Sequence, residues 1–185
     1  MRLSLAELSI EADVSERPGR RAGQGYGFVA ALTVTAVLGA CAANTPVTNT
    51  VPTLYLPLAS NTAQVDTGTA RDMISSYRRN HGAGPLALDP ELQKLAETEV
   101  AAMAAADRPS QAQTVKSAVT RLGYEDVNAN LSAGYHTLAE AFSGWRESPP
   151  HNATMLAPQA TKMGIATAYA RGSKYKVYWA LLTAR

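Results

Sequence analysis

Two alternating stretches near the end of the chain constrain its fold most. Residues 162–169 and 175–183 place apolar and polar side chains in turn, which is the two-residue period of strands. The segment between them, 170–174, contains Gly172 and is typical of a hairpin turn. Helical patterns occupy the chain ahead of these strands. The sequence therefore predicts an α+β fold in which helices cover an antiparallel sheet with a C-terminal β-hairpin.

A helix that begins at Asp89 has the clearest start in the chain. Asp89 is a good N-cap, Pro90 suits the first helical position, and Glu91 lies near the positive end of the helix dipole. Apolar residues then follow at helical spacing as far as Met103, and Arg108-Pro109 ends the helix. Other elements are predicted as helices over 67–80 with Thr67 or Thr69 as the cap, over 113–122 closed by Gly123, and over 138–146, a loop or short strand over 128–135, and a turn at Pro149-Pro150.

The N-terminal part of the chain has the features of a secretory signal. Three arginines precede a mostly apolar run over 26–40, which ends in Leu-Gly-Ala-Cys at Cys41. This order resembles a bacterial lipoprotein signal, whose lipobox places a bulky aliphatic residue three positions before the cysteine. A membrane-spanning helix is the alternative, but the run is shorter than the roughly 18 to 20 residues that cross a bilayer. We therefore expect residues 1–41 to be a signal that ends at a lipidated Cys41.

The flanks of this signal refine the expectation. Four acidic residues lie within residues 1–16, which is unusual ahead of a signal, so these residues are interpreted as a mis-assigned start. Ala42 after the cysteine resembles lipoproteins that reach an outer membrane and face the periplasm. Residues 42–66 are rich in Asn, Thr, Pro and Ser and predict a disordered tether, in which only Leu54, Tyr55 and Leu56 are apolar enough to dock.

Composition excludes several other classes of function. The formal net charge is +2, from 17 basic and 15 acidic residues without long runs of one sign, so nucleic-acid binding is not expected. Cys41 is the single cysteine, which rules out an internal disulfide and cysteine-rich metal sites. With 46% apolar and 17% charged residues the chain fits one globular domain with appendages.

The stretch over 139–156 holds the best candidates for chemistry. Glu140 lies on a predicted helix and His151 follows the proline turn, so a carboxylate and an imidazole are expected to face one cleft. Both residues also have a purely structural interpretation. Glu140 would be a solvated helix residue near Arg146, and His151 would be a turn residue that hydrogen-bonds to Glu140 as a clasp without a metal. Trp145 is expected in the core. A serine hydrolase using Ser148 or Ser132 with His151 lacks the G-x-S-x-G context.

Five ordered blocks resemble the cysteine-rich secretory, antigen 5 and pathogenesis-related superfamily, called CAP, whose bacterial members are SCP-like proteins. The resemblance covers residues 67–185 and implies a CAP domain there, with a three-layer α/β/α sandwich. The blocks begin with S-Y-R-R-N-H-G at Ser76, N-L-S-A-G-Y at Asn130, G-W-R-E-S-P-P-H at Gly144, K-M-G-I-A at Lys162 and Y-W-A-L-L at Tyr178.

The resemblance also implies a cleft lined by two histidines and two acidic residues, which in several members hold a divalent metal. Glu140 matches the second acid and His151 the second histidine, and Trp145 and Asn130 belong to the same blocks and are assigned to the cleft. Ala129 stands at the position of the first acid, and residues 101–120 contain no histidine. Zinc sites use three or four protein ligands, so no zinc site is expected here. His151 remains a candidate ligand, and a site would need Glu125, Asp126 or Asn128 to contribute as well.

These observations lead to two functional hypotheses. The first is a membrane-anchored lipoprotein of the cell envelope that is non-catalytic and binds an apolar ligand or an envelope partner, because family members have been linked to lipid or sterol binding. The second is a hydrolase that acts on an envelope polymer or peptide through Glu140 and His151, with or without a metal. A purely structural lipoprotein is not separable from the first by sequence.

Overall fold

A computed structural model describes residues 50–185 of the 185-residue chain. The expected signal, its Cys41 and the start of the expected tether lie outside the described residues. No helix within 50–185 has the length and apolar character needed to cross a bilayer. In chain order the elements are η1 (Thr53–Tyr55), α1 (Thr67–Asn80), β1 (Ala87–Leu88), α2 (Pro90–Ala106), α3 (Ala112–Arg121), β2 (Asn128–Ala133), α4 (Leu138–Glu147), α5 (Pro149–Met155), β3 (Lys162–Tyr169) and β4 (Val177–Ala184).

The sheet is built on the predicted C-terminal hairpin. β3 and β4 are antiparallel, with Lys162 opposite Ala184 and Tyr169 opposite Val177. β2 pairs antiparallel with the other edge of β4, and the order of strands is β1-β3-β4-β2. β4 is therefore central, and all of its residues are buried. The expected antiparallel sheet is confirmed, except that the two-residue β1, which is too short to carry a pattern, runs parallel to β3.

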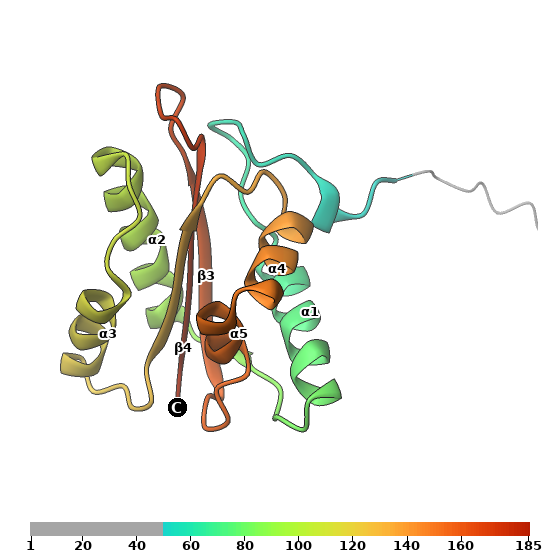
Figure 1. Ribbon diagram of the computed structural model, residues 1–185, viewed down its shortest axis with the longest axis vertical. Coiled ribbons are helices and arrows are strands. Elements are labelled where there is room, and N and C mark those ends of the chain that lie inside the picture. The colour runs from blue at the N-terminus through green and yellow to red at the C-terminus, as the bar shows by residue number, and fades with distance from the viewer. Residues whose placement is uncertain (1–49) are drawn as a thin grey trace, which may run out of the picture. The chain divides into compact units, whose positions relative to one another are not determined.

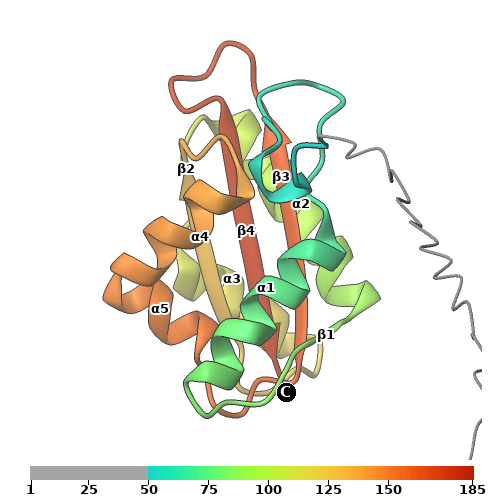
Figure 2. The ribbon, with the colours of Figure 1, turned by 90° about the vertical axis from the view of Figure 1, so that its right-hand side faces the viewer.

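Helices cover both faces of this sheet. Figure 1 shows α2 and α3 on one side and α1, α4 and α5 on the other, and Figure 2 shows the second face directly. Each face has its own apolar core, one centred on Trp145, Ile74 and Trp179 and the other on Leu92, Met103 and Tyr178. The three-layer α/β/α arrangement that the resemblance implies is confirmed.

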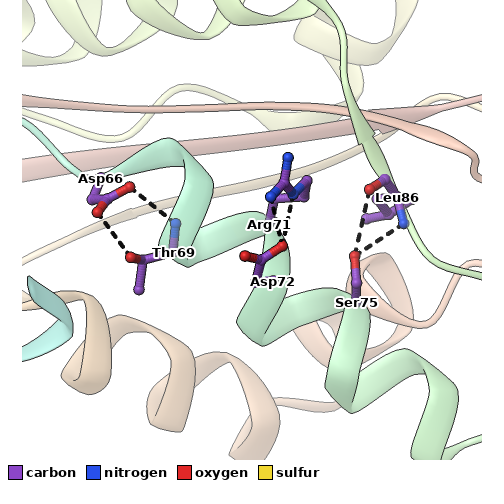
Figure 3. A network of polar contacts seen from close by, with 6 residues as sticks. All are labelled: Asp66, Thr69, Arg71, Asp72, Ser75 and Leu86. Carbon is purple, nitrogen blue, oxygen red and sulfur yellow. Dashed lines mark hydrogen bonds and ion pairs between the residues drawn. The ribbon is translucent and has the colours of Figure 1, made fainter.

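Helix starts follow the capping rules, with one difference from the prediction. Asp89 caps α2 as expected, because its carboxylate accepts the Leu92 N–H at 2.9 Å. The cap of α1 is Asp66, and not a threonine: Asp66 accepts the Thr69 N–H at 2.9 Å and the Thr69 hydroxyl at 2.8 Å (Figure 3). These hydrogen bonds hold the pKa of Asp66 below its usual value. A carboxylate one residue earlier thus replaces the hydroxyl as the acceptor.

The expected turn at Pro149-Pro150 is wrong, because these prolines begin the short helix α5. Proline is compatible with the first turn of a helix, where its missing N–H has no intrahelical partner. Ser148 separates α5 from α4 and has an extended backbone. His151 therefore lies in the first turn of a helix.

The expected tether over 42–66 is also corrected for its described part. Leu58 and Val65 are buried, with 6% and 8% of their surface exposed, and the Leu58 N–H donates to the carbonyl of His136 at 2.8 Å. Leu54 packs on the same core, whereas Tyr55 and Leu56 are exposed. Scattered apolar residues between the prolines are enough to bind this segment to the domain.

Arg78 ties three segments together inside the domain. Its guanidinium has no exposed surface and donates to four main-chain carbonyls. The Nε atom donates to Gly84 at 2.6 Å, Nη1 to Met155 at 2.7 Å and Ala157 at 3.0 Å, and Nη2 to Ala160 at 2.9 Å. Burial lowers the pKa of Arg78, but arginine remains charged in proteins. This side chain therefore links α1 to the loop that follows α5.

Gly164 marks the closest approach of a helix to the sheet. A Cβ atom at this position of β3 would lie 2.3 Å from the carbonyl carbon and oxygen of Leu92. The helix α2 is fixed there by the Gln93 side chain, which accepts the Ile165 N–H and donates to the Ile165 carbonyl, both at 3.0 Å. Only glycine permits this contact.

Candidate functional site

Glu140 is part of the start of helix α4. Thr137 caps the helix by accepting the Glu140 N–H at 3.2 Å, and one carboxylate oxygen of Glu140 accepts the His136 N–H at 2.7 Å. This exchange is close to a capping box, which satisfies N–H groups that a helix start leaves unpaired. The side chain is otherwise exposed to solvent. Glu140 thus has a structural role that its residue type alone does not reveal.

The imidazole of His151 is turned into the protein. Its Nδ1 atom is buried and has no hydrogen-bond partner within 50–185. Its main-chain carbonyl accepts the Asn130 side-chain amide at 2.9 Å, and the Oδ1 atom of the fully buried Asn130 likewise has no partner in the described structure. Burial lowers the pKa of His151, so the imidazole is neutral near pH 7. The bond from the Asn130 amide to the His151 carbonyl holds α5 against β2.

The expected clasp between Glu140 and His151 is wrong. Among residues 50–185 no hydrogen bond or ion pair joins the two side chains, and Glu140 contacts the His136 N–H instead. Glu140 lies in the first turn of α4 and His151 beyond its last turn, so roughly 10 Å of helix separates their backbones along the helix axis. Arg146, the other expected partner of Glu140, lies over the ring of Phe142 at 5.4 Å.

Trp145 supports the sheet and does not line a cleft. It has no exposed surface, and its ring meets Trp179 edge to face at 5.8 Å. Its indole N–H donates to the Ser132 hydroxyl at 3.1 Å. Ser132 is thereby engaged in the core, and Ser148 lies at the junction of α4 and α5. The residues of a serine hydrolase are therefore not assembled around His151.

The remaining positions do not supply metal ligands. Ala129 presents a methyl group where the resemblance implies the first acid. The three substitute donors face elsewhere: Asp126 pairs with Arg185 at 3.2 Å, Glu125 pairs with the same guanidinium, and the Asn128 amide donates to the Asp126 carbonyl at 2.8 Å. Within the described part of the chain, no three His, Cys, Asp or Glu side chains lie close enough to share an ion. These residues do not fit zinc, which needs at least three protein ligands.

A groove of about 430 Å³ lies beside these positions. It runs between α3, the start of β2 and the end of α5, next to Ala129 and His151 in the chain. The apolar residues of its lining are Val127, Ala153, Ala157 and Pro158. The polar residues are Lys116, Asp126, Asn128 and Gln159. No sequence pattern indicates this groove, because its lining comes from three elements that meet only in the fold.

The sequence itself decides the family. Residues 71–182 match the Cysteine-rich secretory protein family, designated CAP. The chain belongs to the CAP family. Because the match extends over the groove, α4, α5 and the hairpin, the CAP resemblance predicted from five short blocks is confirmed. The sequence has no significant match among curated proteins.

Solved structures of bacterial CAP-fold proteins resemble this domain. An outer surface protein from Borrelia burgdorferi is 15% identical with a TM-score of 0.56, over 66% of this chain and 97% of that protein. An extracellular protein containing an SCP domain from Bacillus anthracis is 18% identical with a TM-score of 0.53, over 64% of this chain and 39% of that protein. A cysteine-rich secretory protein from Staphylococcus aureus is 15% identical with a TM-score of 0.51, over 63% of this chain and 36% of that protein. This chain therefore corresponds to well under half of the last two proteins, and the likeness concerns the fold.

The buried imidazole predicts a pH dependence of stability. Between the lowered pKa of folded His151 and the ordinary value of 6.5, the unfolded chain binds a proton that the folded chain does not. Stability is therefore expected to fall as pH drops from 7 through this window. Thermal unfolding at pH 7 and pH 5 should show a smaller loss in His151→Asn than in the wild type. The exposed His136, changed to Asn as the control, should retain the wild-type loss, and equal losses in all three proteins would contradict the burial of the imidazole.

Proposed function

We propose that this chain is a lipid-anchored CAP-domain protein of the cell envelope that binds a ligand or partner and does not catalyse a reaction. Cys41 is its lipidation site, and the outer membrane, on its periplasmic side, is its location. The observation that carries the proposal is the structural use of the two retained cleft residues. Glu140 accepts the His136 N–H just before α4, and the half-buried His151 has its Nδ1 atom inside the protein near the contact of α5 with β2.

The proposed location has two supports. The Leu-Gly-Ala-Cys sequence ending at Cys41, after a basic and apolar segment, has the order of a lipoprotein signal. The structurally similar Borrelia burgdorferi protein is described as an outer surface protein. More than one acyl chain on a cysteine is sufficient for stable anchoring of a soluble domain.

The groove beside α5 is the proposed binding site. Its lining combines apolar residues, such as Val127 and Ala157, with polar ones, such as Lys116 and Gln159. This combination suits an amphiphilic envelope molecule better than a purely apolar one. The volume of about 430 Å³ is within the range of small-molecule sites. The ligand class is therefore a lipid or lipid-like molecule with one polar end.

Retention of envelope lipid tests this function. The mature protein is purified from envelopes and its bound lipids are identified by mass spectrometry. Ala153 is exposed on α5 and lines the groove, so Ala153→Trp should fill the groove and abolish retention. Ala105 is exposed on α2 away from the groove, and Ala105→Trp should retain lipid like the wild type. Retention that is unchanged in Ala153→Trp, or no lipid in the wild type, would contradict the proposal.

The hydrolase hypothesis has one observation in its favour, namely the two buried polar atoms without partners, His151 Nδ1 and Asn130 Oδ1. Buried polar groups are usually hydrogen-bonded, so such a pair requires an explanation. A hydrolase would need Glu140 to join them, and Glu140 caps a helix instead. A screen of envelope polymers and peptides with the wild type, Glu140→Gln and His151→Ala decides the matter. Equal rates in all three would end the hydrolase hypothesis.

The capping role of Glu140 gives a separate prediction for stability. Glu140→Ala removes the acceptor of the His136 N–H and should lower the free energy of unfolding by about 1 kcal/mol. Glu140→Gln keeps an acceptor oxygen and should stay within about 0.5 kcal/mol of the wild type. Urea unfolding measures both. A Glu140→Ala protein as stable as the wild type would show that the carboxylate has no capping role.

A further inference from the structure

The segment that enters the domain has an apolar side turned to solvent. Val51, Tyr55 and Leu56 have 55%, 56% and 44% of their surface exposed, within six consecutive residues. Leu54 and Leu58 from the same segment pack on the core, so the segment has apolar side chains both on the core and in solvent. The only other large hydrophobic residue exposed to this degree in the described chain is Leu122. An apolar side of this kind needs a partner to cover it.

The position of this segment in the chain identifies the partner. Val51 follows Cys41 by ten residues, and ten residues span at most about 36 Å when fully extended. If Cys41 is acylated, the exposed residues are held within that distance of the bilayer. Tyrosine and leucine are the kinds of side chain that enter the interface between headgroups and acyl chains.

Basic residues lie at the same end of the domain. The tip of the β3–β4 hairpin carries the exposed Arg171 and Lys174, and neither forms an ion pair among residues 50–185. Figures 1 and 2 both show this tip at one end of the domain and the C-terminus at the other, with residues 50–65 in the half of the domain that holds the tip. Exposed cations near a bilayer are attracted to anionic lipid headgroups.

A polar cluster joins the hairpin tip to the end of α2. Asp107, at the end of α2, accepts hydrogen bonds from the Ser173 hydroxyl at 2.5 Å and from the Tyr178 hydroxyl. The two hydroxyl oxygens lie 2.6 Å apart, so the three groups form one compact cluster. These bonds lower the pKa of Asp107, and burial followed by the contact with Asp107 raises the pKa of Tyr178. The cluster therefore holds Ser173, which lies between the exposed Arg171 and Lys174, against the end of α2.

Three carboxylates in this half of the domain accept hydrogen bonds from the domain itself. Asp107 bonds to the hairpin, Asp66 caps α1 and Glu140 accepts the His136 N–H. Each of them therefore directs at least one oxygen toward donors of the domain itself. The exposed Arg171 and Lys174 of the hairpin tip are therefore available to bind an anion outside the domain.

From these observations we infer that the end of the domain formed by Val51, Tyr55, Leu56 and the hairpin tip rests on the bilayer that holds the lipid anchor. Tyr55 and Leu56 enter the interfacial region, and Arg171 and Lys174 contact anionic headgroups. This orientation leaves the groove beside α5 away from the hairpin tip and open to the periplasm. The inference rests on the proposed anchoring at Cys41.

Tryptophan quenching by brominated lipids tests the orientation in the full-length, processed protein. The native Trp145 and Trp179 are fully buried and give a low background. Tyr55→Trp places an indole on the proposed contact. Leu122→Trp places one beside Lys162 and Arg185, at the opposite end of β3 from the hairpin tip, and is the matched control.

In vesicles of phosphatidylcholine and phosphatidylglycerol, Tyr55→Trp should be quenched at least about twofold more than Leu122→Trp, because interfacial tryptophan reaches the acyl chains. Replacing Arg171 and Lys174 together with Gln should reduce this quenching in these vesicles but not in phosphatidylcholine alone. Equal quenching of the two tryptophans in a protein whose mass shows acylated Cys41 would overturn the orientation alone. A mass without acyl chains would overturn the anchoring on which it rests.

Discussion

Arg78→Met is expected to lower the free energy of unfolding by about 3 to 5 kcal/mol. The substitution keeps an apolar stem in the core but leaves the carbonyls of Gly84, Met155, Ala157 and Ala160 without their donor. A buried carbonyl without a partner carries the full cost of its lost hydration, and here several lose it together. Thermal unfolding should show a fall in Tm of roughly 10 to 15 °C for a domain of this size.

The neighbouring arginine supplies the control for this prediction. Arg79 is exposed in the last turn of α1 and forms no ion pair in the described structure. Arg79→Met should change the free energy of unfolding by less than about 0.5 kcal/mol. Arg78→Lys should recover only part of the loss, because an ammonium cannot reach four carbonyls as a planar guanidinium does. If Arg78→Met unfolded at the wild-type temperature, the link from α1 to the α5 loop would not stabilise the domain.

Gly164→Ala is the second change with a large expected effect. Its new methyl group would lie 2.3 Å from the main chain of Leu92, so helix α2 would have to move away from β3. That movement disturbs the two hydrogen bonds of Gln93 with Ile165 and the packing of one whole core. The expected cost is about 3 kcal/mol, as for other overpacked cores.

Gly172→Ala is the matched control in the same hairpin. Nothing lies within 4 Å of a Cβ atom at Gly172, so this variant should unfold like the wild type. Chemical denaturation of the two variants separates a local clash from a general intolerance of the hairpin to alanine. A Gly164→Ala protein with the stability of Gly172→Ala would show that α2 does not contact β3 as described.

The elements with regular patterns could be predicted from the sequence. Strand β3 begins and ends at the predicted residues, and α2 begins after Asp89 as its capping residues indicate. The antiparallel hairpin and the layered fold followed from these elements and from the CAP resemblance. What failed were features that depend on neighbours in space. β1 has only two residues, and α5 begins with two prolines that are equally compatible with a turn.

Arg78 shows another limit of sequence reasoning. On a helix with alternating polar and apolar residues, an arginine is ordinarily taken to be solvated. Its burial depends on carbonyls that lie six to 82 positions later in the chain. No local pattern contains that information.

The candidate site was predicted in its residue types but not in its contacts. Residue matching to the CAP blocks selected Glu140 and His151 and identified Ala129 as the missing acid. Their contacts were not predictable, because a carboxylate in the first turn of a helix suits both a cleft and a cap. Trp145 was expected in the core and was also assigned to the cleft; it has no exposed surface and packs on Trp179 in the core. The groove between α3, β2 and α5 could not be predicted from the sequence, because its lining residues are brought together only by the fold.

Together these contacts describe a CAP domain in which the retained cleft residues stabilise two helices. The three substitute donors near the cleft are occupied by Arg185 or by the main chain. Binding at a groove, from a fixed position at a membrane, is the function that this arrangement supports best. The protein is therefore expected to carry a bound ligand or partner, and to need no metal at Glu140 and His151.

Native mass spectrometry of the mature protein, purified from its own envelope, tests this claim most directly. We expect the mass of a chain whose first residue is an acylated Cys41. We also expect a noncovalently bound lipid or protein partner, which collisional activation should release. A stoichiometric divalent metal that is present in the wild type and lost in His151→Ala would contradict it. That result would mean that His151, and with it Glu140, belongs to a metal site.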